Sequence, residues 1–159
     1  MEIGENIEME NNFSEKTLKL WKKIGTHGIM TLSTCAENRV TSRSMSVVVY
    51  DVKFYCQTNE TFLKYKQIAV NPNVALCLKN YSIEGKCRII GNPLDESNSH
   101  FIELFKKHFF MSFKAYSALP TEKLLEITPV LIYSWEYKLT KPFMEYFDFE
   151  NQTYRLEMR

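Results

Sequence analysis

The hydrophobic and polar positions of this chain change their period near residue 29. Before that point, FSEKTLKLWKKIG carries Leu18, Trp21 and Ile24 at near-helical spacing, with Ser14 as the expected N-cap. After it, three segments rich in valine, threonine and aromatic residues predict strands: IMTLSTC, VTSRSMSVVVY and KFYCQT. Because the loops between them are short, with a turn at Glu37 and Asn38, antiparallel pairing is expected.

Further along, short strands continue to outnumber helices. A helix at about 61–70 precedes strands at NVALCLKN and EGKCRIIG, with the turn expected between Tyr81 and Gly85. Asp95 is the expected N-cap of a helix in DESNSHFIELFKKHFF, and SALPTEKLLEITP predicts a shorter helix. PVLIYSWEY predicts a strand, and FMEYFDFENQTYRLE a closing hairpin. This order favours a mainly β, partly closed antiparallel barrel of about six strands with peripheral helices over a parallel sheet.

Composition narrows the class of protein. At 159 residues with 45% hydrophobic content, the chain predicts one globular domain over 13–159, preceded by a flexible segment over 1–12. A net charge of +1 gives no sign of nucleic-acid binding, and no apolar run approaches the ~20 residues of a membrane span. The acidic, polar start of the chain leads us to expect a cytoplasmic protein. The four cysteines lack metal-ligand spacing and are expected to be free thiols.

Candidate chemistry begins at the segment TNETFLKYKQIAVNPNVAL, which joins a strand to a helix. The start of a helix offers free backbone N–H groups and a positive dipole end, which suit a phosphate. Lys64 lies one turn into that helix, where its ammonium could reach the same anion. The alternative is an ordinary connection with a solvated lysine.

Arg43 is the second candidate. Strand alternation places it on one face of VTSRSMSVVVY together with Thr41, Met45 and Val47. An arginine among apolar neighbours needs an anion or water for its donors. The alternative is a side chain that extends to a carboxylate at the surface.

Three segments, NRVTSRSM, KFYCQTNETFLKYKQIAVNPNVAL and EGKCRIIG, together resemble the pyridoxamine 5'-phosphate oxidase-like family of FMN-binding split β-barrels. The resemblance runs without gaps from Thr58 to Leu76 and more loosely over 29–91, with Trp135 as a further match and cofactor contact. It implies an antiparallel split barrel that binds FMN as a homodimer, with the cofactor at the subunit boundary.

The resemblance also implies roles for individual residues. Arg43 and Lys64 match the side chains that hold the flavin phosphate. Ser44 and Met45 match positions whose backbone meets the isoalloxazine ring. Thr58 and Asn59 match the strand end beside the phosphate and the ribityl chain.

Two departures from the family pattern bear on function. Phe62 and Leu63 stand where many members carry Ser-Arg, so two side-chain partners of the phosphate are missing. The C-terminal segment lacks the arginine- and tryptophan-containing ending of the true oxidases, so vitamin B6 oxidation is not expected. The expected function is an FMN-dependent oxidoreductase that passes electrons or hydride between a nicotinamide donor and a small substrate. No residue is assigned as a general acid or base. The alternatives are a non-catalytic flavin- or haem-binding module and a barrel with an empty site.

Overall fold

The computed structural model describes residues 12–159, so the expected flexible segment lies, apart from Asn12, outside the described residues. Its strands are β1 (His27–Ala36), β2 (Arg39–Tyr50), β3 (Lys53–Asn59), β4 (Asn73–Leu78), β5 (Tyr81–Ile89), β6 (Glu122–Lys138), β7 (Lys141–Asp148) and β8 (Thr153–Met158). Its helices are α1 (Phe13–Ile24), α2 (Leu63–Val70), the 3-10 turn η1 (Glu96–Asn98), α3 (Ser99–His108) and α4 (Phe110–Tyr116). No helix within 12–159 is long and apolar enough to cross a membrane.

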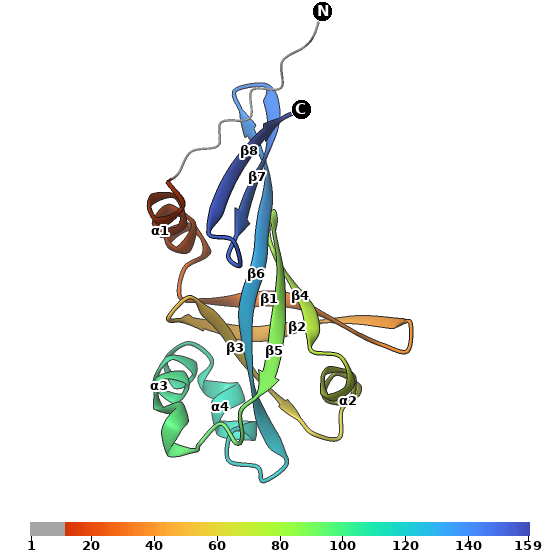
Figure 1. The fold of residues 1–159 in the computed structure, drawn as a ribbon. Coiled ribbons are helices and arrows are strands. Elements are labelled where there is room, and N and C mark those ends of the chain that lie inside the picture. The colour runs from red at the N-terminus through yellow and green to blue at the C-terminus, as the bar shows by residue number, and fades with distance from the viewer. Residues whose placement is uncertain (1–11) are drawn as a thin grey trace, which may run out of the picture.

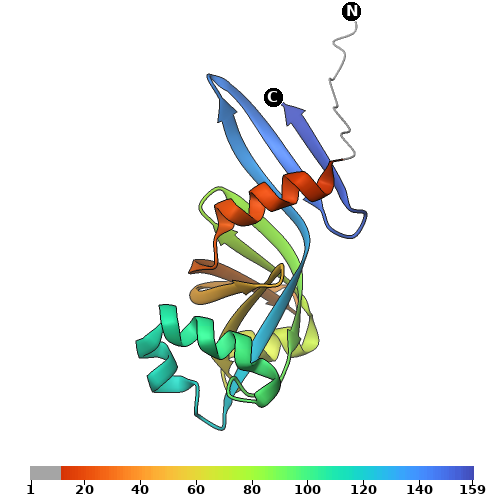
Figure 2. The ribbon, with the colours of Figure 1, turned by 90° about the vertical axis from the view of Figure 1, so that its left-hand side faces the viewer.

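All strands join one antiparallel sheet in the order β3-β2-β1-β4-β5-β6-β7-β8 (Figure 1). An additional pairing of β3 with β6, which sets Phe54 opposite Ile127, closes the first six strands into a barrel. The prediction of an antiparallel split barrel is therefore confirmed. The β7–β8 hairpin continues the sheet beyond the barrel, and α1 lies across it (Figure 2).

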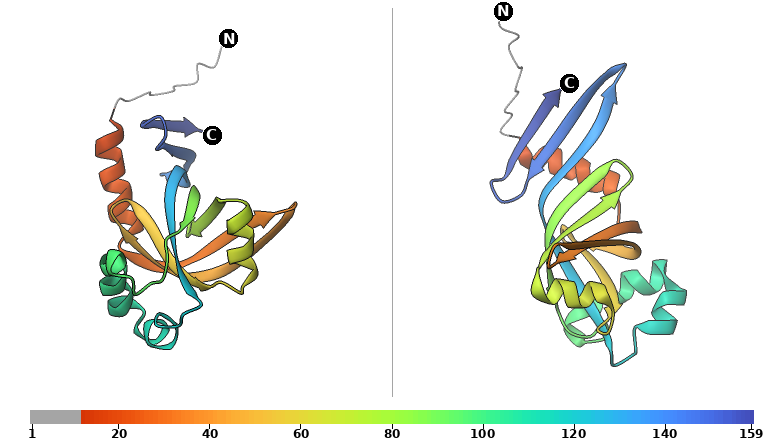
Figure 3. Two further views of the ribbon diagram at one scale, coloured as in Figure 1. Left: turned by 60° about the horizontal axis from the view of Figure 1, so that its bottom comes forward. Right: turned by 90° about the vertical axis from the view of Figure 1, so that its right-hand side faces the viewer.

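The barrel is filled by the inward-facing side chains of its strands. Met30, Leu32, Val47 and Phe54 are each fully buried, as the alternation of apolar positions in the sequence requires. Trp21 of α1 packs against the Phe54 ring, with their centroids 5.6 Å apart. Figure 3 shows α2 on one side of this barrel and the α3–α4 pair on another, so the helices cover separate parts of its wall.

The tight turns follow residues that tolerate a left-handed backbone. The expected turn at Glu37 and Asn38 is confirmed, with φ values of 52° and 60° that suit a two-residue hairpin. The turn between β4 and β5 lies at Lys79 and Asn80, and the expectation of a turn between Tyr81 and Gly85 is wrong. Residues 81–85 belong to β5, where burial of alternate side chains stabilises an extended strand.

Three further expectations are corrected. The helix expected in SALPTEKLLEITP does not form: residues 117–121 are a turn, and from Glu122 the segment is part of the 17-residue strand β6. Leu125 and Ile127 pair with β3 and β5 there and fill the barrel. The N-cap of α1 is Asn12, since the helix begins one residue before Ser14. Asp95 occupies the N-cap position of the η1 turn without a side-chain capping bond, and the N-cap residue of α3 is Asn98.

Gly85 is expected to be sensitive to substitution because it lies at an irregularity in the β5–β6 pairing. A Cβ atom there would come within 2.8 Å of both the Ile127 side chain and the Thr128 carbonyl oxygen. Gly85→Ala is therefore expected to lower the free energy of unfolding by about 1–3 kcal/mol, measured by urea denaturation. Gly28→Ala is the control, because its nearest contact would be an ordinary 3.6 Å. Equal stability of the two variants would contradict this account of the bulge.

Candidate functional site

Arg43 lies in a compact polar cluster on the barrel side of β2, the face that strand alternation predicts. Its Nη1 donates to Thr34 Oγ1 at 2.7 Å and to the Leu32 carbonyl at 3.2 Å, and its Nη2 donates to Thr41 Oγ1. Among residues 12–159, no carboxylate lies within ion-pair distance of the guanidinium. Its charge is therefore held by neutral acceptors, and the expected alternative of a surface carboxylate partner is not observed.

Gln67 of α2 completes this cluster. Its Oε1 accepts from the hydroxyl groups of Thr34 at 2.6 Å and Thr41 at 2.7 Å, while its Nε2 donates to the Arg39 carbonyl at 2.9 Å. The two threonine hydroxyls thus donate to Gln67 and accept from Arg43, which fixes α2 against β1 and β2. Sequence reasoning missed Gln67, although its position three residues after Lys64 places both on one helix face.

Lys64 brings a second positive charge close to Arg43. Burial lowers the pKa of the Lys64 ammonium, and the neighbouring Arg43 charge lowers it further. Glu122 acts in the opposite direction, yet no carboxylate in the described chain lies within ion-pair distance of Lys64. The ammonium instead lies 4.7 Å from the centre of the Phe62 ring. Two half-buried cations without an ion-pair partner form a site that favours an anion.

Lys64→Met is expected to stabilise the ligand-free chain by about 0.5 kcal/mol at pH 7, because it removes a half-buried charge next to Arg43. The folded-state pKa of Lys64 lies below its unfolded value, so the unfolded chain holds more protons in the window below 10.5. That lysine therefore adds stability as the pH rises through the window. Urea denaturation from pH 7 to 10 should show the advantage of the variant shrinking as the pH rises. A wild-type chain that is more stable than the variant at pH 7 would contradict the conclusion that the Lys64 charge next to Arg43 destabilises the fold.

Ser44 and Met45 lie on β2 where one edge of that strand is open. β2 pairs with β3 through Val48–Tyr50, and no strand of the described chain pairs with that edge over 39–47. The other edge pairs with β1 throughout, with Ser44 opposite Thr31. Backbone N–H and C=O groups along the open edge can therefore hydrogen-bond a ligand or another chain.

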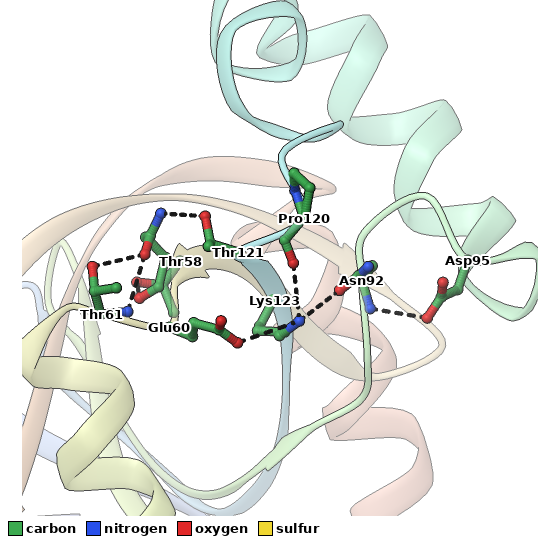
Figure 4. Close-up of polar contacts among 9 residues, drawn as sticks. Thr58, Glu60, Thr61, Asn92, Asp95, Pro120, Thr121 and Lys123 are labelled. Atoms are coloured by element: carbon green, nitrogen blue, oxygen red, sulfur yellow. Dashed lines mark hydrogen bonds and ion pairs between the residues drawn. The ribbon is translucent and has the colours of Figure 1, made fainter.

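The end of β3 forms a preformed turn that leads into α2 (Figure 4). Thr58 is buried, next in the barrel-facing row after Cys56. The Asn59 side chain donates to Thr121 Oγ1 at 2.8 Å and accepts from the backbone N–H and hydroxyl of Thr61 at 3.0 and 2.8 Å. Asn59 therefore fixes the loop that positions the start of α2.

Lys123 beside this turn has a different role from Lys64. Its ammonium donates to the Asn92 side chain at 2.8 Å and the Pro120 carbonyl at 3.2 Å, and it lies 3.4 Å from the Glu60 carboxylate. Figure 4 marks these three contacts with dashed lines. These acceptors compensate its charge and tie three loops together. Lys123 is thus a structural cation, whereas Lys64 has no ion-pair partner in the described chain.

Trp135 is separated from these residues. Lys123 of β6 pairs with Thr58 at the end of β3, and Trp135 lies twelve positions further along β6. At a strand rise of ~3.3 Å per residue, Trp135 is about 40 Å from Lys123 along the strand. It is 41% exposed and packs edge to face with Tyr137. Within one chain, the structure brings Arg43, Lys64 and the end of β3 together, but not Trp135.

Comparison with known proteins agrees with the fold. A sequence model described as pyridoxamine 5'-phosphate oxidase matches residues 16–136, more than half of the chain. The chain therefore belongs to the pyridoxamine 5'-phosphate oxidase family. No curated protein matches it.

Solved structures show the same architecture. General Stress Protein 26 from Bacillus anthracis is 24% identical with a TM-score of 0.56, over 77% of this chain and 92% of that one. A pyridoxamine 5'-phosphate oxidase-related, FMN-binding protein from Nostoc punctiforme is 15% identical with a TM-score of 0.56, over 82% of this chain and 85% of that one. HutZ, a haem storage protein from Vibrio cholerae, is 15% identical with a TM-score of 0.57, over 72% of this chain and 89% of that one. At these identities the similarity establishes the fold alone.

Proposed function

We propose that this protein binds FMN, with the flavin phosphate held between Arg43, Lys64 and the start of α2. The observation that carries this proposal is the pair of half-buried cations without an ion-pair partner in the described chain. A phosphate dianion would supply the missing negative charge, and the first N–H groups of α2 would donate to it. The donor set on these residues therefore fits the phosphate of FMN.

The remaining residues have distinct parts in this proposal. The open edge of β2 at Ser44 and Met45 offers backbone groups to the isoalloxazine ring, and Thr58 and Asn59 shape the loop beside the phosphate. Bound FMN supplies the electron or hydride transfer between a nicotinamide donor and a small substrate. We infer a cytoplasmic homodimer in which a second copy covers the open edge and brings Trp135 near the cofactor. No protein side chain is assigned an acid or base role.

A second candidate function, non-catalytic flavin or haem binding, is favoured by the start of α2. Phe62 and Leu63 are 54% and 39% exposed there, so an apolar surface stands next to the cationic pair. Such a combination also suits a ligand that joins a large apolar ring system to acidic groups. The similarity to HutZ, described as a haem storage protein, is compatible with this alternative.

An absorbance spectrum distinguishes the two functions. Addition of FMN to the purified chain is expected to give a protein-bound flavin spectrum that NADH or NADPH bleaches under anaerobic conditions. A bound flavin that neither nucleotide reduces would favour the non-catalytic role. A Soret band after addition of haem, with no flavin bound, would contradict the proposal and indicate a haem-binding protein instead.

A further inference from the structure

A separate pocket of about 280 Å³ lies between the outer surface of the barrel and the start of α3. Its apolar floor is formed by Ile90, Phe101 and Leu124. One wall is aromatic, because the rings of Tyr50 and His100 stack with centroids 4.4 Å apart and an angle of 13° between their planes. None of its lining residues belongs to the cluster around Arg43.

The polar side of this pocket is an ion pair between Arg88 and the buried carboxylate of Glu126. Arg88 donates through Nε at 3.1 Å and Nη2 at 2.8 Å to Glu126 Oε1, and the Tyr55 hydroxyl donates to Oε2 at 3.1 Å. Lys53 lies 3.6 Å from Oε1. Burial alone would raise the pKa of Glu126, but these partners hold it below its ordinary value. Glu126 is thus an ionised carboxylate whose oxygens are already engaged.

The unengaged polar groups of the pocket are mainly donors. Within residues 12–159, neither Arg88 Nη1 nor the Ser97 hydroxyl has a protein hydrogen-bond partner, and the Arg88 side chain is 71% exposed. The pocket also borders the N-terminal end of α3, whose N-cap residue Asn98 makes no side-chain cap. The first N–H groups of a helix attract anions. A ligand that completes these groups therefore carries an acid.

We propose that this pocket binds a small planar aromatic carboxylate. The ring would lie between the Tyr50–His100 wall and the apolar floor, and the carboxylate would meet Arg88 and the start of α3. Two parallel N–H groups of a guanidinium favour a planar carboxylate, and flat rings stack well on aromatic side chains. The volume lies at the lower limit of ligand pockets, about 300 Å³, so one ring with its acid group fits better than a nucleotide.

Benzoate is the probe for this site, with benzyl alcohol as the neutral compound of similar size. Titration of the ¹⁵N-labelled full-length chain, followed by amide chemical shifts, is expected to give a dissociation constant of about 1 mM for benzoate. The shifts should map to Tyr50, Arg88 and residues 97–101. Benzyl alcohol should bind at least about tenfold more weakly, because it lacks the charge that Arg88 recognises. Equal binding of both compounds would overturn the proposal. So would no binding of benzoate at about 10 mM, which is roughly tenfold above the expected dissociation constant.

Two variants test the assignment of residues. Arg88→Met is expected to weaken benzoate binding at least about tenfold. The Arg88 variant also removes a partner of buried Glu126, so His100→Ala serves as the second variant. His100→Ala removes half of the aromatic wall and no hydrogen bond of the described chain. It should weaken benzoate binding by about fivefold. Arg43→Met is the matched control and should leave benzoate binding unchanged. Shifts that map to Arg43 and Lys64, or unchanged affinity in both pocket variants, would place benzoate elsewhere and reject the site.

Discussion

Arg43→Ala is expected to weaken FMN binding by about 10- to 100-fold, because a charged hydrogen bond contributes roughly 1.5–3 kcal/mol. Arg43 and Lys64 share one region of positive charge, and neither has an ion-pair partner in the described chain. Lys64→Ala should therefore show a loss of similar size. Fluorescence titration with FMN measures both effects.

Two controls separate phosphate recognition from other causes. Riboflavin lacks the phosphate, so its affinity should change much less than that of FMN in both variants. Lys66→Ala removes the same charge from an exposed position of the same helix and should leave FMN affinity within about twofold. Equal losses for FMN and riboflavin, or an equal loss in the Lys66 variant, would show that the phosphate is not held at this cluster.

Phe54→Ala is expected to lower the free energy of unfolding by about 3–5 kcal/mol. Phe54 is fully buried, pairs with Ile127 where β3 closes the barrel on β6, and contacts Trp21 of α1. Loss of its ring leaves a cavity at the point that joins the barrel seam to the helix. Urea denaturation provides the measurement.

Phe110→Ala is the matched control, since the same atoms are deleted from a ring that is 51% exposed. It should lower the free energy of unfolding by only about 0.5 kcal/mol. A Phe54 variant as stable as the Phe110 variant would mean that closure of the barrel does not depend on this contact.

Strand alternation in the sequence predicted the strand faces well. Thr41, Arg43 and Val47 lie on the inner side of β2, because the two-residue period is a property of the strand itself. The same local reasoning failed at β6. Its segment 122–129 has leucines and charges that suit a short helix, and pairing with β3 and β5 makes it extended instead.

The candidate site shows the same division between local and distant information. The proximity of Lys64 and Arg43 required the packing of α2 against β1 and β2, which Gln67 fixes through side-chain hydrogen bonds. No sequence period reports such a contact between distant segments. The position of Trp135 along β6 likewise depended on a strand whose full length the sequence did not indicate.

A paired titration of the unmodified chain with FMN and riboflavin tests the central claim most directly. The two ligands share the ring and the ribityl chain, so their difference in affinity isolates the phosphate. If Arg43, Lys64 and the start of α2 hold that phosphate, FMN should bind at least about tenfold more tightly than riboflavin. Equal affinities, or binding of neither flavin, would contradict the claim.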